Sequence, residues 1–203
     1  GIVETSMLRR LGTRMQRTHE RREASIFVGP PGIGKTTAIR AFRANNPGTV
    51  IVIHSVMKHA ATGTQALQQV ALALRAHQGH DTGYITNARA QVLQEIDGRI
   101  ARICDDLPRD AEPDSFPKLT LVIDEAQKLT REAIDSLRVY NEPHYSCRGA
   151  FPIGMIFIGN EELSLQVARD GKSLLDIGMA DRLRFSERLS YDDLEREDYA
   201  AFI

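Results

Sequence analysis

The sequence has few of the features that mark secreted, membrane-spanning or strongly basic proteins. Its two cysteines, Cys104 and Cys147, form no closely spaced pair, so a disulfide framework or a paired-cysteine metal site is not indicated. It contains no signal peptide and no long apolar segment, and we therefore expect a cytoplasmic protein. The formal net charge of −1 gives no overall attraction to nucleic acid or membrane, so any such partner requires a local patch.

Apolar, strand-like stretches alternate with helical patterns along the chain, without an internal repeat or low-complexity tract. This alternation predicts an α/β fold with a doubly wound, mostly parallel sheet flanked by helices. A chain of 203 residues can bury the core of one such domain. Because the first residue is Gly1 rather than methionine, we expect a piece excised from a longer protein. The expected strands are 25–28, 49–53, 119–123 and 153–158, and the expected helices are 5–20, 35–45, 63–77, 86–106 and about ten residues after Thr130.

A glycine-rich segment matches the phosphate-binding pattern GxxxxGK[ST] directly after the first expected strand. Glycines allow the backbone to wrap closely around a polyphosphate with its N–H groups pointing inward, at the positive end of the following helix. Lys35 can then reach the β and γ phosphates, and the Thr36 hydroxyl can ligate Mg²⁺. The pattern therefore predicts an ATP site rather than a turn that binds nothing. The residues expected at the nucleotide are Gly29, Pro30, Pro31, Gly32, Ile33, Gly34, Lys35, Thr36 and Thr37.

Two carboxylates follow a second apolar stretch, residues 119–123. Such a nearly continuous apolar run is typical of a parallel strand that is buried on both faces, and open α/β sheets bind ligands at the carboxyl ends of their strands. We therefore expect Asp124 to hold Mg²⁺ directly or through water. Glu125 is the candidate general base that orients and polarises the attacking water. Taken alone, the pair could also be an acidic helix start.

Two further patterns in the sequence have explanations that involve no ligand or partner. The helical stripe in residues 86–106 is expected to face the core rather than a partner; it comprises Val92, Leu93, Ile96, Ile100, Ile103 and, just beyond, Leu107. The pairs His77 with His80 and His144 with Cys147 could supply zinc ligands, but pairs of this kind arise by chance among six histidines.

The order and spacing of four segments resemble an AAA+ ATPase over nearly the whole chain. Residues 29–36 and 121–125 look like its Walker A and Walker B motifs, residues 157–160 like sensor 1, and residues 179–183 like an arginine-finger region. The resemblance implies that Asn160 helps Glu125 to hold the attacking water. It also implies that Arg182, or as a second choice Arg184, reaches the γ-phosphate of a neighbouring subunit, which requires a homo-oligomer with ATP at the subunit interface.

Among AAA+ proteins, the chain is most similar to the DNA-transposition ATPases of the MuB/TniB (TnsC-like) type. The segments that carry this likeness are 3–5, 124–126 and 158–160. The resemblance implies a regulator that assembles on double-stranded DNA, selects target sites and recruits a transposase. Secretion ATPases similar to ExeA share the box at 124–127, and origin-recognition ATPases share the general plan, so an oligomeric ATPase for protein remodelling or secretion is the alternative. Glu125 and Asn160 disfavour a signalling switch with little turnover, and the length disfavours a helicase with two cores.

Residues that could contact DNA lie in basic segments. The arginines of residues 1–22 could touch DNA, although a solvated or intersubunit face explains them better. Basic residues just beyond strand ends could line a channel and bind phosphates without sequence preference. The resemblance places the AAA+ core at residues 1–189, with an enlarged stretch at 141–151 and the start of a helical lid at 190–203. The candidate DNA contacts beyond strand ends are Lys58, Lys128, Arg131 and Arg148.

Overall fold

The computed structural model describes residues 5–54, 63–81, 83–108, 117–141, 153–163 and 183–190. For residues 183–188, and for Arg131 and Arg138, it describes the backbone alone. The predicted lid at 190–203 lies outside these residues except for Ser190, and so does nearly all of the enlarged stretch at 141–151.

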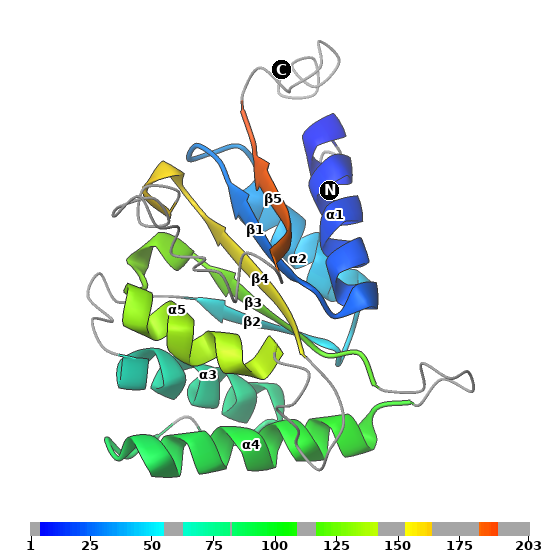
Figure 1. The fold of residues 1–203 in the computed structure, drawn as a ribbon. Helices are drawn as coiled ribbons and strands as arrows, with labels where there is room; N and C mark the ends of the chain where they lie inside the picture. The colour runs from blue at the N-terminus through cyan, green and yellow to red at the C-terminus, as the bar shows by residue number, and fades with distance from the viewer. Residues whose placement is uncertain are drawn as a thin grey trace.

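The centre of the molecule is a parallel sheet of five strands in the order β2-β3-β4-β1-β5 (Figure 1). All four neighbouring pairs are parallel, so the carboxyl ends of the strands meet at one edge of the sheet. Strands from the middle of the chain and from its beginning thereby become neighbours at this edge. The strands are β1 (Ala24–Val28), β2 (Val50–His54), β3 (Thr120–Asp124), β4 (Gly154–Gly159) and β5 (Leu183–Arg188).

The central strands are apolar on both faces because each face is covered by helices. Along β1, Ile26 belongs to one buried cluster and the next residue, Phe27, to the other. In the same way Leu121 and Val122 of β3 point to opposite clusters. This alternation explains why the strands read as continuous apolar runs and why the sheet has a hydrophobic core on each side.

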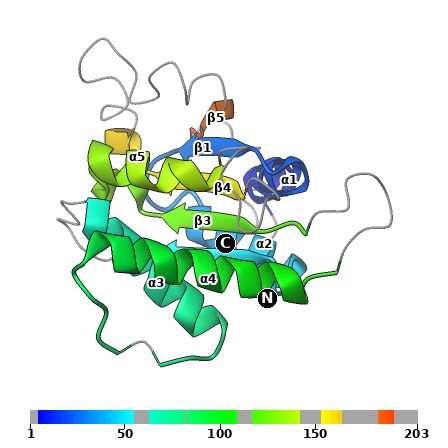
Figure 2. The same cartoon turned by 60° about the horizontal axis from the view of Figure 1, so that its bottom comes forward.

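In the part of the chain that the structure describes, five α-helices form the two outer layers (Figures 1 and 2). Helices α1 and α2 pack against each other and supply the apolar cluster on one face. Helix α3 packs against both α4 and α5 on the other face. The result is a three-layer α/β/α sandwich. The helices are α1 (Ser6–Arg21), α2 (Lys35–Asn45), α3 (Gly63–His77), α4 (Arg89–Asp106) and α5 (Arg131–Arg138), with 3₁₀ turns η1 (Ala126–Lys128) and η2 (Val139–Asn141).

Local hydrogen bonds fix where several helices begin. The Thr5 side chain caps α1 by accepting a hydrogen bond from the Leu8 N–H at 3.1 Å, and the Thr130 hydroxyl caps α5 by accepting one from the Ala133 N–H at 3.3 Å. Helix α4 begins at Arg89, three residues later than predicted, because Thr86 instead closes a turn by accepting from the Ala88 N–H at 3.1 Å.

Most predicted elements are confirmed, with shifts of one residue at several ends. The stripe of α4 faces the core as expected: Val92, Ile96 and Ile100 are at most 2% exposed. Strand β5 was not predicted, and it extends the sheet beside β1. Within the described residues, no helix is long and apolar enough to span a membrane.

Candidate nucleotide-binding site

The glycine-rich segment connects β1 to α2 at the carboxyl edge of the sheet, next to the end of β4. The Gly29 N–H donates to the Gly159 carbonyl at 3.1 Å, which ties the start of the segment to the neighbouring strand. Gly32 and Gly34 have φ angles of 79° and 96°, a region that residues with a side chain rarely adopt. Gly34 is also the N-cap residue of α2. The backbone therefore turns into the helix in the way that a phosphate-binding loop requires.

Lys35 is the first residue of α2, and its ammonium group lies inside the loop. It is 9% exposed, and its Nζ donates to the Gly29 and Pro30 carbonyls, each at 2.7 Å. Burial lowers the pKa of Lys35, and the nearby carboxylates of Glu125 and Asp124 partly offset this by raising it. A buried cation close to two carboxylates and held by backbone carbonyls is suited to a polyphosphate, whose oxygens can replace those carbonyls as its partners.

The residues that follow Lys35 are differently exposed. Thr36 is exposed on the first turn of α2, whereas Ile33 is buried in the cluster beneath the loop. Thr37 is half-buried. Thr36, the residue predicted to ligate Mg²⁺, is therefore not covered by the rest of the described fold.

Asp124 is the last residue of β3 and is 4% exposed. Its Oδ1 accepts from the Glu125 N–H at 3.0 Å, and its Oδ2 lies 3.3 Å from Nδ1 of His54. His54 ends the adjacent strand β2, in register with Asp124. Sequence reasoning did not identify His54; its position as the last residue of a strand at this edge was the available signal.

Glu125 leaves the strand in a left-handed conformation, with φ 57° and ψ 39°. The structure surrounds its carboxylate with two polar side chains from the 3₁₀ turn that follows. Gln127 Nε2 donates to Oε2 at 2.8 Å, and Lys128 Nζ lies 3.5 Å from the same oxygen. Lys128, predicted as a DNA contact, is therefore an ion-pair partner of the candidate base. Gln127 was not predicted as part of the site.

Asn160 follows β4 directly and lies at the same edge. Its Oδ1 accepts from the Glu162 N–H at 2.9 Å, and its own backbone N–H donates to Gln127 Oε1 at 3.2 Å. The structure thus places Asn160 beside Gln127, which in turn contacts Glu125.

The remaining predicted residues are not placed with their side chains. Lys58, Arg148 and Arg182 lie outside the described residues, and Arg131 is described by its backbone alone at the start of α5. His144 and Cys147 also lie outside, and within the described part of the chain no cluster of three metal-binding side chains occurs.

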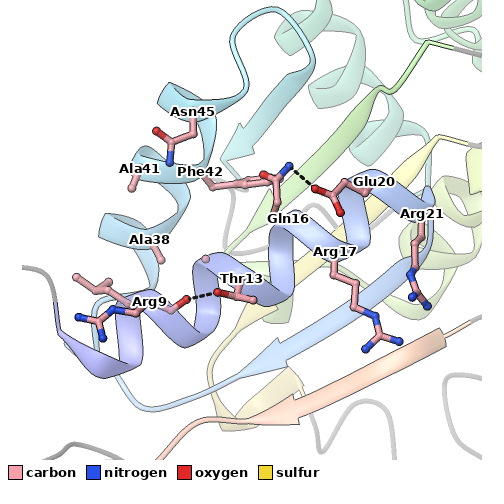
Figure 3. Close-up of a pocket in the computed structure, with 12 residues that line it drawn as sticks. Arg9, Thr13, Gln16, Arg17, Glu20, Arg21, Ala38, Ala41, Phe42 and Asn45 are labelled. Atoms are coloured by element: carbon pink, nitrogen blue, oxygen red, sulfur yellow. Dashed lines mark hydrogen bonds between the residues drawn. The ribbon is translucent and has the colours of Figure 1, made fainter. Parts of the chain in front are cut away.

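A hollow of about 820 Å³ lies elsewhere, on the surface formed by α1 and α2 (Figure 3). Its lining includes the exposed arginines Arg9, Arg17 and Arg21 and the apolar side chains of Leu8 and Phe42. Its one glycine is in the interior of α1, where backbone N–H groups are already used by the helix. The hollow therefore lacks the free backbone donors that the loop at residues 29–36 could offer to a polyphosphate.

Comparison with solved structures supports the fold through one match with a TM-score of 0.50. Pif1 helicase from Candida albicans is 14% identical with a TM-score of 0.50, covering 98% of this chain and 42% of that chain. A structure of two Pif1 helicases at forked double-stranded DNA has 15% identity and a TM-score of 0.46, covering 94% of this chain and 44% of that one. Drosophila ORC bound to GC-rich DNA and Cdc6 has 11% identity and a TM-score of 0.45, covering 90% and 56%. The chain thus spans about half the length of the chains it matches, and the likeness to the Candida albicans helicase concerns the fold alone.

Sequence comparison gives the family. No curated protein sequence matches the chain significantly. The family described as AAA domain matches residues 17–167, which include the phosphate-binding loop, Asp124, Glu125 and Asn160. Together with the parallel sheet and the loop between β1 and α2, this match shows that the chain belongs to the AAA domain family of P-loop proteins.

Proposed function

We propose that the protein binds ATP with Mg²⁺ and hydrolyses it at the carboxyl edge of the sheet. The observation that carries this proposal is the position of Lys35, Asp124 and Glu125 at that edge, where each carboxylate raises the pKa of Lys35 against the larger effect of burial. A phosphate loop alone would support binding. The adjacent carboxylates add the groups that hydrolysis needs.

Each residue has a distinct part in the proposed reaction. Backbone N–H groups of the loop and the Lys35 ammonium would hold the phosphates, while Thr36 and Asp124 would hold Mg²⁺. The bound metal would neutralise charge that develops on the phosphate oxygens. Glu125 would accept a hydrogen bond from the attacking water and orient it toward the γ-phosphate.

Assembly and domain boundaries form the second part of the proposal. Residues 1–189 would form the AAA+ core and residues 190–203 the start of a lid, as the resemblance implies. Arg182, directly before β5, would stabilise the transferred phosphate on a neighbouring subunit of a homo-oligomer. Strand β5, which follows Arg182 in the sequence, is paired with β1, the strand that precedes the phosphate loop.

We further propose that the assembled protein binds double-stranded DNA and regulates transposition, in keeping with the resemblance to the MuB/TniB type. Support comes from Lys128: it is at the same edge as the reacting groups and pairs with Glu125 at 3.5 Å with 32% of its side chain exposed. A DNA phosphate that competes for Lys128 would change the surroundings of Glu125. DNA binding and ATP turnover are therefore expected to be coupled.

The test is ATP turnover with and without duplex DNA at about 50 mM salt, where phosphate contacts are strong. We expect turnover to rise with DNA of any sequence, and DNA affinity in the presence of ATP to fall steeply as salt increases. Turnover that is present but unaffected by DNA, together with no DNA binding, would favour the protein-remodelling or secretion ATPase. Absence of turnover under all conditions would contradict the ATPase proposal itself.

A further inference from the structure

The side-chain amide of Gln127 joins two parts of the site that are far apart in the sequence. Its Nε2 donates to Glu125 Oε2 at 2.8 Å, and its Oε1 accepts from the Asn160 N–H at 3.2 Å. Glu125 follows β3, and Asn160 follows β4. One amide therefore connects the candidate base to the end of the neighbouring strand.

Packing holds this amide in place. Gln127 is 8% exposed and lies in the 3₁₀ turn directly after Glu125. A Cβ added to Gly159 would come within 2.7 Å of Gln127 Oε1. The amide thus occupies space that is available only because residue 159 is glycine, at the strand end where the site is formed.

The two contacts to the Glu125 carboxylate are made to the same oxygen. Gln127 Nε2 and Lys128 Nζ both approach Oε2, at 2.8 Å and 3.5 Å. The Glu125 side chain is 45% exposed, so without these contacts it would sample several rotamers. Fixing Oε2 orients the carboxylate and leaves the role of water acceptor to Oε1.

We propose that Gln127 is a positioning residue for ATP hydrolysis: it orients the Glu125 carboxylate and couples it to Asn160 at the end of β4. This inference rests on the proposed ATPase function. Only a primary amide of this length supplies a donor to the carboxylate and an acceptor for the backbone N–H at once. Glutamate would replace the donor with a second negative charge, and methionine would remove both hydrogen bonds while keeping a similar length.

The experiment compares the wild-type chain with Gln127→Met and with a matched control, Gln68→Met. Gln68 also makes two side-chain hydrogen bonds, to the Thr86 carbonyl at 2.8 Å and Asn87 Oδ1 at 3.0 Å, but it belongs to α3. We expect Gln127→Met to lower kcat about tenfold with KM for ATP unchanged, because a group that orients the reaction acts on the transition state. Gln68→Met should leave both values unchanged.

A second readout does not depend on turnover. Hydrogen exchange of the Asn160 backbone N–H, followed by NMR, should become several-fold faster in Gln127→Met because this N–H loses its acceptor. The exchange rate should be unchanged in Gln68→Met. Gly159→Ala, whose added Cβ would meet Gln127 Oε1 at 2.7 Å and also Leu163 at 3.0 Å, should give the same faster exchange and lower kcat. This variant keeps the test decisive if Gln127→Met folds poorly.

The two readouts separate the possible failures. An unchanged exchange rate of the Asn160 N–H in both Gln127→Met and Gly159→Ala would show that Gln127 does not accept a hydrogen bond from it. Faster exchange with unchanged kcat would overturn the positioning role while leaving the ATPase intact. Absence of turnover in the wild-type chain would overturn the proposed function and with it the catalytic part of this inference. The exchange rate would still show whether Gln127 and the Asn160 N–H are hydrogen-bonded.

Discussion

Two clusters of charged side chains in this molecule differ in how their charges are matched. At the carboxyl edge of the sheet, the ammonium group of Lys35 donates hydrogen bonds to two backbone carbonyls, and burial lowers its pKa. Between α3 and α4, the Glu95 carboxylate accepts hydrogen bonds from Arg75 at 2.6 and 2.8 Å and from Arg99 at 2.8 Å. Hydrogen bonding to Arg75 is the main reason why the pKa of Glu95 falls to about 2.

This difference is the one expected between a cluster that binds the proposed nucleotide and a cluster that stabilises the fold. Burial of Lys35 disfavours its charge, and this cost is offset when a polyphosphate supplies negative oxygens. Glu95 already has strong charged partners, so its ionised form stabilises the folded state without any ligand. The two clusters should therefore respond in opposite ways to mutation.

The largest effect is expected at Lys35. Lys35→Ala should weaken ATP binding by about 100-fold, because a buried charge-assisted contact to phosphate is lost, while the free energy of unfolding changes little. Arg40→Ala is the control: Arg40 is an exposed cation on the same helix, and its removal should leave ATP affinity unchanged. Isothermal titration calorimetry and urea unfolding measure both quantities. Equal losses of affinity in the two variants would indicate a general charge effect and break the comparison.

The opposite result is expected at Glu95. Glu95→Gln should lower the free energy of unfolding by on the order of 1–3 kcal/mol at neutral pH, since hydrogen bonds to a charged group are lost, and leave ATP affinity unchanged. Glu132→Gln, at an exposed ion pair with Arg89, should cost less than about 1 kcal/mol.

The same variant gives a pH dependence whose sign follows from the pKa of Glu95. The unperturbed value is 4.5 and the folded-state value about 2, so its contribution to stability is complete above pH 4.5 and is lost as pH falls toward 2. The difference in unfolding free energy between wild type and Glu95→Gln should shrink over this range. A difference that stays constant on acidification would show that Glu95 stabilises by packing alone.

A smaller effect is expected from two glycines that differ in conformation. Gly34→Ala should weaken ATP binding by roughly tenfold, because φ of 96° strains an alanine and its Cβ would lie 3.1 Å from Leu8. Gly98→Ala, in the interior of α4 where an added Cβ meets nothing within 4 Å, should stabilise the fold by roughly 0.5–1 kcal/mol without affecting ATP. Thermal unfolding and nucleotide titration distinguish the two. Normal ATP affinity in Gly34→Ala would show that the loop tolerates another conformation.

The phosphate-binding half of the site could be predicted from the sequence because its determinants are local. The loop is a continuous segment, residues 29–36, and the helix that follows was predicted with the bounds Lys35–Asn45 that the structure has. Glycine conformation and helix polarity act within a few residues, so a short sequence pattern contains the features that shape the loop. The position of Asp124 and Glu125 after an apolar strand was predictable for a similar reason.

The other half depends on contacts between distant residues, and here sequence reasoning was incomplete. Gln127 acquires its role only when β3 and β4 become neighbours, which brings residue 160 to it. His54 likewise meets Asp124 only through the register of β2 and β3. Strand β5 has the sequence LRFSER, in which three of the six residues are charged, and it forms an edge of the sheet. It therefore lacks the apolar run by which the inner strands were recognised.

The central claim is that Glu125 activates water for hydrolysis of bound ATP, and Glu125→Gln tests it most directly. Measured side by side, nucleotide affinity and phosphate release separate binding from chemistry. We predict that Glu125→Gln binds Mg-ATP as tightly as the wild-type chain and releases phosphate at least about 100-fold more slowly, in the range expected for loss of a general base. Phosphate release at the wild-type rate, with normal affinity, would contradict the account.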